Sequence, residues 1–354
     1  MEKDLIYITS NIAPFRVDLL DELSQYFKKV TLCYYEELEE GVNPLYVKKR
    51  PQNVELQCLK DLSIFDSFKI IEKASFIIFD GYSGKSKILL MFACILKKKK
   101  YMISIDGIIP KRHKDGCLRH FLKHLLIGKA AVVFSTNHRS DEIIRRFNSS
   151  AKIVRHIFST IKEHDIDDIK SKMCEELALK YDISIKKKRI LFVGKFLIAK
   201  GIKELLECAK IMGYEFILIG GTKQQLEEKN LEIVDNVKII PFLEKKDVLS
   251  MMSISDVFVL PTYTDVWGLV IIEALMCGMP VVTTSQCNAG MEFITEGKNG
   301  YIVPIRDSEA LSKAIEKALT LDKENVQRHN VKALGDYTIE NSAYNMQKII
   351  YEKG

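Results

Sequence analysis

The chain has 354 residues, of which 47% are hydrophobic, and a formal net charge of +6. This length accommodates two domains of ordinary size, and no stretch approaches the roughly 20 apolar residues that a membrane-spanning helix needs. Acidic residues interrupt the short apolar run of the N-terminus MEKDLIYI, which is not the pattern of a secretory signal peptide. The eight cysteines include no Cys-x-x-Cys pair, which favours reduced thiols in a cytoplasmic protein over disulfides or zinc ligands.

The charge is distributed unevenly along the chain. Residues 51–150 contain 18 Lys/Arg against 9 Asp/Glu, whereas residues 201–300 contain 8 against 14. A basic N-terminal half favours an anionic partner, which can be a nucleic acid, a membrane surface or a phosphorylated substrate. Nucleic acid is the weakest of the three, because the basic segment lacks interleaved aromatic residues on which bases would stack.

The N-terminal half alternates predicted strands and helices. A strand over 5–9 leads into the loop 10–16 and an amphipathic helix over 17–27. By itself the loop, with Asn11 and Arg16, indicates no more than a turn before a helix. Further along we predict strands over 76–79, 101–105, 132–134 and 152–157. We also predict a helix that ends at Leu96 and a helix over 141–147, with Ser140 as the N-cap of the second helix.

A basic segment lies between Lys97 and Lys129 and contains ten Lys/Arg and two Asp. Within it, apolar residues at 118, 121, 122, 125 and 126 alternate with basic residues at 119, 120, 123 and 124, which predicts an amphipathic helix with a cationic face. Two interpretations stay open. The face is a solvated surface, or it docks on anionic lipid and presents the active site to a lipid-linked acceptor.

The C-terminal half opens with a strand over 190–193, the loop Gly194-Lys195…Lys200-Gly201 and a helix over 202–212. Two ammonium groups beside the positive end of a helix favour a phosphate site. Strands over 215–219 and 237–240 follow, and Phe242 and Leu243 stand after the second. Helices near 307–320 and 338–352 close the chain.

The most informative stretch is residues 256–283. A strand over 257–260 ends at a proline, a polar loop and a helix over 267–277 follow, and a second strand begins at 281. This βαβ unit places the loop at the carboxyl edge of a parallel sheet, where open α/β sheets bind ligands. The loop and helix bring together two carboxylates and the backbone N–H groups of a positive helix end, at Asp265, Glu273, Gly268 and Leu269.

This stretch resembles the donor-binding signature of retaining glycosyltransferases of family 4. The shared features are a strand ending in Pro-Thr, an acidic residue, aromatic-Gly-Leu, a Glu eight positions after the acid, and Ala-Leu-x-x-Gly-x-Pro-Val-Val. The resemblance covers nearly all of residues 190–305 and is looser over 1–160. It implies an α/β protein with the GT-B fold, in which two Rossmann-like doubly wound domains face a cleft. The N-terminal acceptor domain would be 1–165 with a C-terminal crossover helix 338–354, and the nucleotide-sugar domain 166–337.

The resemblance also implies roles for individual residues. Lys195, where the family usually has Arg, and Lys200 would hold the donor diphosphate in the loop that begins at Gly194. Glu273 would bind the ribose hydroxyls, and Asp265, in place of the usual Glu, would orient the transferred sugar, which leaves the identity of that sugar open. The catalytic set is then Asp265, Glu273 and Lys200, and the remaining donor residues are Gly268, Leu269, Phe242 and Leu243. On the acceptor side, the family's similar opening loop makes Asn11 and Arg16 candidates, with Arg16 gripping a phosphate. Asp106 and His113 are further acceptor-side candidates, chosen only for their position in the chain.

The function implied is hexosyl transfer from a nucleotide sugar, most simply a UDP-sugar, to a glycan or polyprenyl-diphosphate-linked acceptor in cell-surface polysaccharide synthesis. Family precedent implies no cofactor and no metal, and a cytoplasmic enzyme that can associate peripherally with the inner face of the plasma membrane. A nucleotide-sugar 2-epimerase or glycogen-synthase-like enzyme of the same fold stays open, as does a non-catalytic GT-B subunit that binds a partner or membrane. A dinucleotide oxidoreductase is disfavoured, because both halves lack Gly-x-Gly-x-x-Gly.

Overall fold

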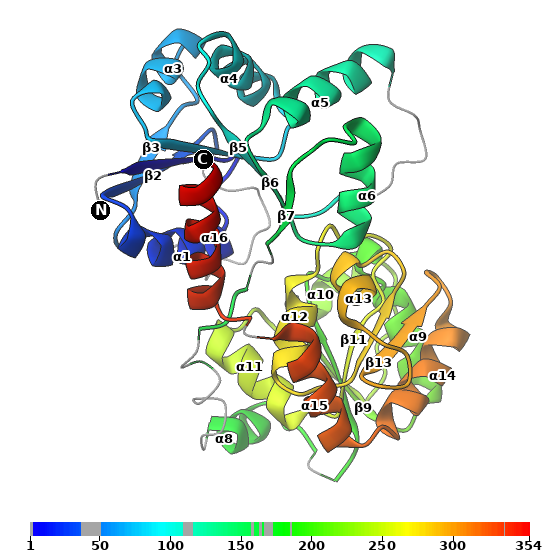
Figure 1. The fold of residues 1–354 in the computed structure, drawn as a ribbon. Helices are drawn as coiled ribbons and strands as arrows, with labels where there is room; N and C mark the ends of the chain where they lie inside the picture. Colours follow the sequence, from blue (N-terminus) through cyan, green and yellow to red (C-terminus); the bar gives the residue numbers. More distant parts are fainter. Residues whose placement is uncertain are drawn as a thin grey trace. The chain divides into compact units, whose positions relative to one another are not determined.

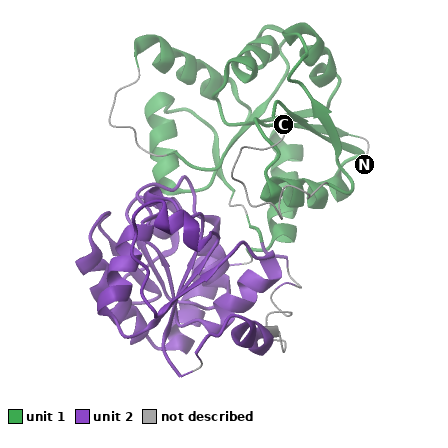
Figure 2. Cartoon of the chain, turned by 180° about the vertical axis from the view of Figure 1, so that it is seen from behind, with its two compact units in different colours: residues 1–160, 337–354 green, residues 161–336 purple. Residues whose placement is uncertain are grey.

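The computed structural model describes residues 3–36, 51–108, 116–156, 159–162, 165, 173–184, 186–335 and 337–354. The chain forms two compact units, which Figure 2 colours separately: unit 1 is residues 1–160 with 337–354, and unit 2 is residues 161–336. The sequence analysis had placed residues 161–165 in the first domain and Tyr337 in the second, and the structure assigns both the other way.

Unit 1 is built on a parallel sheet of seven strands in the order β3-β2-β1-β4-β5-β6-β7. The order reverses between β1 and β4, which makes the carboxyl ends of these two strands the topological switch point. The middle of the sheet is buried: Ile8 of β1, Ile77 of β4 and Ile103 of β5 are all fully buried. The strands are β1 (Asp4–Ile8), β2 (Lys29–Tyr34), β3 (Glu55–Cys58), β4 (Phe76–Asp80), β5 (Met102–Ile105), β6 (Val133–Ser135) and β7 (Ile153–Arg155).

The helices of unit 1 correct two predictions. The first helix begins at Pro14, three residues early, because proline fits the first helical position, where its missing N–H is not needed. Asn137, not Ser140, caps the helix before β7, since its Oδ1 accepts the backbone N–H of Ser140 at 2.8 Å. The helices are α1 (Pro14–Leu23), the 3₁₀ turn η1 (Ser24–Tyr26), α3 (Ile64–Glu72), α4 (Lys85–Leu96), α5 (Cys117–Lys129), α6 (His138–Phe147) and α16 (Ile339–Lys353).

The C-terminal helix α16 packs against α1 within unit 1 (Figure 1). The ring of Tyr351 stacks on that of Phe27 with 5.3 Å between centroids and meets the ring of Phe76 edge-on. Its hydroxyl donates to the backbone oxygen of Tyr26 at 2.9 Å. Aromatic packing of this kind buries a large apolar area, so the last helix is a structural part of the N-terminal unit.

Unit 2 contains a second parallel sheet, of six strands in the order β10-β9-β8-β11-β12-β13. Its switch point lies between β8 and β11. Since both faces of such a sheet are covered, its central strands are continuous apolar runs, and all four residues of β11 are buried. The strands are β8 (Arg189–Val193), β9 (Glu215–Ile219), β10 (Val237–Ile240), β11 (Val257–Leu260), β12 (Val281–Thr284) and β13 (Gly300–Val303).

The helix of the 256–283 stretch begins at Leu269, two residues later than predicted. Gly268 precedes it with a φ of +92°, a left-handed conformation that interrupts the helix, and the Trp267 ring packs edge-on against Phe293. The helices of unit 2 are α8 (Met173–Lys180), the 3₁₀ turn η2 (Ile198–Lys200), α9 (Ile202–Ile211), α10 (Lys223–Glu227), α11 (Lys245–Ile254), α12 (Leu269–Met276), α13 (Asn288–Phe293), α14 (Ser308–Leu319) and α15 (Lys323–Leu334).

The two sheets confirm the prediction of two Rossmann-like doubly wound units. Each strand order follows the arrangement 3-2-1-4-5-6, extended by one strand in unit 1. In the described parts of the chain, every helix is too short or too polar to cross a bilayer.

Candidate active site

Two loops meet at the switch point of unit 2. One follows β8 and ends at Gly201, and the other follows β11 from Pro261. Gly201 has a φ of +73°, and a Cβ at this position would overlap the carbonyl oxygen of Pro261, so this close approach requires glycine. The backbone N–H of Tyr263 donates to the carbonyl oxygen of Ala199 at 2.8 Å. The two loops are therefore in direct backbone contact.

An ion pair joins the same loops. The Nζ of Lys200 lies 2.6 Å from the Oδ2 of Asp265, and both side chains are partly exposed, at 26% and 18%. Asp265 is held on two further sides: its backbone N–H donates to Gln286, and its Oδ1 accepts from the backbone N–H of Trp267. The structure thus brings together two residues that the sequence analysis singled out separately.

Gly194 and Lys195 begin the loop that carries Lys200, directly after β8. The N–H of Gly194 donates to the carbonyl oxygen of Ile219, and a Cβ on Gly220 would come within 2.5 Å of the Gly194 oxygen, so the ends of β8 and β9 are close. Lys195 is half-buried, and the described residues give it no carboxylate partner. Its ammonium group is consequently available to an anion.

The start of α12 supplies the other polar groups of the candidate site. A Cβ on Gly268 would come within 2.5 Å of the Cys287 sulfur, so glycine is required here as well. The N–H groups of Leu269 and Val270 have no acceptor within the helix, whereas that of Ile271 donates to the carbonyl oxygen of Gly268 at 2.9 Å. Glu273 lies four residues further, on the same face as Leu269, and is half-buried. This arrangement combines a positive helix end with a carboxylate one turn away.

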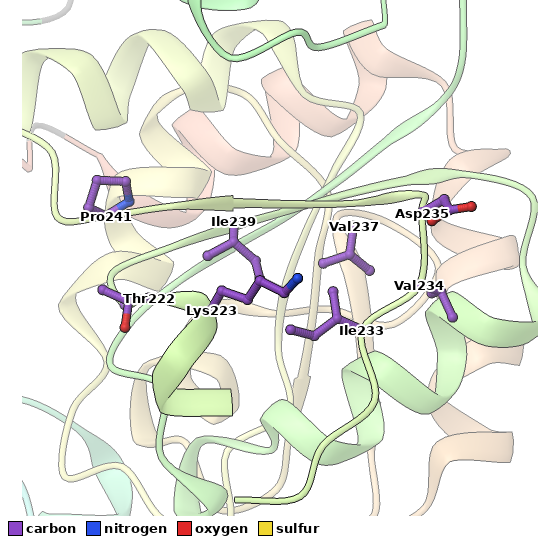
Figure 3. Close-up of a pocket in the computed structure, with 9 residues that line it drawn as sticks. Thr222, Lys223, Ile233, Val234, Asp235, Val237, Ile239 and Pro241 are labelled. Atoms are coloured by element: carbon purple, nitrogen blue, oxygen red, sulfur yellow. The ribbon is translucent and has the colours of Figure 1, made fainter. Parts of the chain in front are cut away.

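Phe242 and Leu243 follow β10, half-buried and buried respectively. A cavity of about 560 Å³ lies close by, along β10 and α10 (Figure 3). Thr222 and Pro241 lie at one end of it and Val234 and Asp235 at the other. None of the nine predicted donor residues lines this cavity, which belongs to the edge strand and not to the switch point.

The acceptor-side candidates lie at the carboxyl edge of the sheet in unit 1. Arg16 is 2% exposed, and its guanidinium contacts Asp80 at 3.0 Å and Asp106 at 2.8 Å. Burial lowers the pKa of Arg16, but the two carboxylates outweigh it and raise the pKa overall. Asn11 pairs with Glu36 through its backbone. His113 lies outside the described residues.

This arrangement corrects the expectation that Arg16 grips a phosphate. Its guanidinium is buried and already neutralised, whereas the side chains of Asp80 and Asp106 are 20% and 26% exposed. Burial raises the pKa of Asp106, and Arg16 opposes that shift. Arg16 therefore organises two carboxylates at the sheet edge. The sequence analysis missed Asp80, although its place at the end of β4, beside the switch point, is a usable signal.

Sequence reasoning also missed three residues around the unit 2 site. The hydroxyl of Tyr263 donates to the Oε1 of Glu204 at 2.6 Å, and the guanidinium of Arg306 lies 4.9 Å from the centre of the Tyr263 ring. Tyr263 stood inside the stretch that resembles the donor signature, but no pattern in the sequence linked it to Glu204, 59 residues earlier.

One segment of the chain matches a known family model. Residues 175–333 match the family described as Glycosyl transferases group 1. The matched segment comprises the sheet of unit 2 and both loops that carry Lys200 and Asp265.

Two curated relatives cover part of the chain. The capsular polysaccharide biosynthesis glycosyltransferase CapM of Staphylococcus aureus is 32% identical over 136 residues, which is 36% of this chain and 36% of the relative. N,N'-diacetylbacillosaminyl-diphospho-undecaprenol alpha-1,3-N-acetylgalactosaminyltransferase of Campylobacter jejuni is 27% identical over 140 residues, 39% of this chain and 37% of the relative. The chain thus spans little more than a third of the length of these relatives.

The solved structure of Anabaena Alr3699/HepE in complex with UDP is similar over the whole chain. It superposes with a TM-score of 0.75 at 16% identity, covering 99% of this chain and 100% of that one. At this level of identity the likeness shows the fold, and it confirms the GT-B fold expected from the sequence.

Proposed function

We propose that this protein is a retaining glycosyltransferase of the family 4 type that transfers a hexose from a UDP-sugar. The observation that carries the proposal is the Lys200–Asp265 pair at the switch point of unit 2, beside Lys195 and the N-terminus of α12. The family match over 175–333 and the two partial relatives, both named as glycosyltransferases, support the activity. The UDP complex of the HepE structure supports the choice of nucleotide.

In this proposal the charges of unit 2 act on the departing diphosphate. Lys195, Lys200 and the positive end of α12 would neutralise the negative charge that develops as the glycosidic bond breaks, without a metal ion. Glu273 would accept hydrogen bonds from the ribose hydroxyls, and Asp265 would orient the transferred sugar. Phe242 and Leu243 would contact the base, while Asp106, with Asn11 and His113, would belong to the acceptor side.

For the acceptor we propose a glycan or a polyprenyl-diphosphate-linked sugar of a cell-surface polysaccharide. The Campylobacter relative is named for a diphospho-undecaprenol substrate, and the Staphylococcus relative for capsular polysaccharide. Such a lipid-linked acceptor would require the enzyme to work at the cytoplasmic face of a membrane.

The surface of α5 supports such a peripheral position. Leu118 and Phe121, which the sequence pattern placed on an apolar face, are 72% and 59% exposed, and the cationic Arg119, next to Leu118 in the sequence, is exposed as well. Apolar side chains among cations are typical of a helix that lies in the interface of an anionic bilayer. Salt-sensitive flotation with phosphatidylglycerol vesicles, lost in Leu118→Ser/Phe121→Ser, is the expected result. Equal binding to phosphatidylcholine, or none, contradicts it.

Thermal stabilisation by nucleotide sugars tests the donor assignment. A ligand that binds only the folded state raises its stability, so UDP-sugars should raise the melting temperature more than GDP- or ADP-sugars, without added metal. The shift should disappear in Glu273→Ala and persist in Glu296→Ala, which removes an exposed carboxylate elsewhere in unit 2. If no nucleotide sugar stabilises the protein, the non-catalytic interpretation of the fold replaces this one.

A further inference from the structure

We propose that Tyr263 and Glu204 form a positioning pair that holds the Lys200–Asp265 ion pair together. Tyr263 lies two residues before Asp265 in the loop after β11, and Glu204 lies four residues after Lys200 in the first turn of α9. The Tyr263–Glu204 hydrogen bond of 2.6 Å and the Lys200–Asp265 pair of 2.6 Å therefore join the same two segments, side by side.

The environment of Glu204 makes this bond costly to lose. Glu204 is 5% exposed, and its Oε2 is buried with no hydrogen-bond partner among the described residues. The other carboxylate oxygen of Glu204, Oε1, accepts a hydrogen bond from the hydroxyl of Tyr263. A buried carboxylate left without this donor would have to move toward water, and the first turn of α9 would move with it.

Tyr263 is itself held from several sides. Its backbone N–H binds Ala199 at 2.8 Å, and the neighbouring Thr262 hydroxyl binds the same carbonyl oxygen at 3.1 Å. The Arg306 guanidinium, from the segment after β13, lies over its ring. Burial and the hydrogen bond to Glu204 raise the pKa of Tyr263 to about 12, so the hydroxyl remains a donor at neutral pH. Tyr263 and Glu204 thus fix the loop without themselves belonging to the proposed donor contacts.

The reactivity of Lys200 toward an acylating reagent measures this role without any sugar donor. The test uses the full-length protein, trace acetic anhydride and mass spectrometry of each lysine. A lysine bound to a carboxylate reacts slowly. In Tyr263→Phe the labelling rate of Lys200 should rise by about 3- to 10-fold, the factor that corresponds to one lost hydrogen bond. Glu204→Gln, which keeps an acceptor oxygen, should retain the slow rate, and Glu204→Ala should lose it.

The chain offers a matched control. Tyr214 donates to Glu316 at 2.7 Å in the same unit, so Tyr214→Phe removes an equivalent but exposed bond and should leave Lys200 unchanged. Lys195, in the same loop, has no carboxylate partner among the residues that the structure describes and is the internal reference. Unchanged labelling of Lys200 in Tyr263→Phe overturns the proposal. An equal rise at Lys195 and Lys200 also overturns it, since the loop as a whole would then have loosened. Neither outcome depends on the proposed transferase activity, which the nucleotide-sugar experiment tests separately.

Discussion

Lys200 and Asp265 stand 65 residues apart in the chain and meet at 2.6 Å between Nζ and Oδ2. The pair joins the loop after β8 to the loop after β11, the two strands that border the switch point of unit 2. The sequence analysis assigned Lys200 to the donor diphosphate and Asp265 to the transferred sugar. Their direct contact therefore connects the two parts of the candidate donor site. In the proposed enzyme, a diphosphate that binds Lys200 has to compete with Asp265 or share the ammonium group with it.

This competition predicts opposite effects of one substitution on binding and on transfer. Asp265→Asn should strengthen UDP binding by about threefold, because it frees Lys200 and removes a negative charge beside the diphosphate, an effect of roughly the size of a partly exposed ion pair. Transfer should nevertheless fall, because the sugar loses its orienting carboxylate. Calorimetric titration with UDP measures the first effect, and weaker UDP binding in Asp265→Asn would show that the two groups do not compete.

Lys200→Ala should lower turnover by about 10²-fold or more, as the loss of a group that stabilises developing charge does in other enzymes. Lys203→Ala is the matched control, since Lys203 lies three residues on, is exposed and pairs with Glu207 at 3.8 Å. Steady-state kinetics with the donor identified by thermal stabilisation compares them. Similar turnover for Lys200→Ala and Lys203→Ala would remove Lys200 from the proposed site.

Gly201→Ala and Gly297→Ala separate backbone strain from close packing. Both glycines have almost the same φ, +73° and +72°, but a Cβ would overlap Pro261 at Gly201 and meet only the Tyr301 hydroxyl at 3.9 Å at Gly297. Gly297→Ala should cost about 1–2 kcal/mol for the left-handed conformation, and Gly201→Ala about 1–3 kcal/mol more for the overlap. Urea unfolding of the two variants gives the comparison, and equal costs would mean that the loops do not approach as closely as the structure shows.

Asp256 gives unit 2 a pH-dependent contribution to stability. This buried carboxylate accepts from the backbone N–H of Arg189 at 3.0 Å and pairs with Lys323 at 3.1 Å. Burial alone would raise its pKa, but these partners lower it below the ordinary 3.8. The stabilisation is therefore complete above pH 3.8 and is lost as the pH falls through the lower, folded-state pKa.

We accordingly expect Asp256→Asn to destabilise the protein by about 2 kcal/mol at neutral pH, the range for hydrogen bonds to a charged group. The difference from the wild type should shrink when both are unfolded by urea at pH values below 3.8. A difference that is unchanged in acid would show that the carboxylate charge contributes nothing.

The C-terminal helix should be essential to unit 1. Ile350, on α16, is fully buried, so Ile350→Ala should destabilise the protein by about 3 kcal/mol through the cavity it leaves. Lys348→Ala, two residues earlier on the exposed face, should change stability by less than about 0.5 kcal/mol. Thermal unfolding of both variants is followed by the proteolytic release of peptides from unit 1. Equal stability of the two variants would contradict the packing of α16 on α1.

Much of the fold was readable because parallel strands buried on both faces are continuous apolar runs, and glycine and proline mark their ends. The strands of the 190–283 region fall where these runs lie, β11 without any shift. The elements that were missed, among them β2, β3, α3 and α15, lack such boundaries or carry mixed polarity. Helix starts were displaced where a special residue decided them, as Pro14 and Gly268 do.

By itself the sequence determined the fold class and the types of group that the unit 2 loops carry: two lysines, two carboxylates and a helix start after glycine. These follow from local patterns, in which the spacing of residues along one segment fixes which strand end or helix face they occupy. Only the tertiary structure decided which charges neutralise each other. It paired Lys200 with Asp265 and Tyr263 with Glu204, and it enclosed Arg16 between Asp80 and Asp106. Most of these partners lie on loops and helices that follow neighbouring strands of one sheet but are distant in the chain. Their electrostatic energy depends on distance and burial, which no single segment contains.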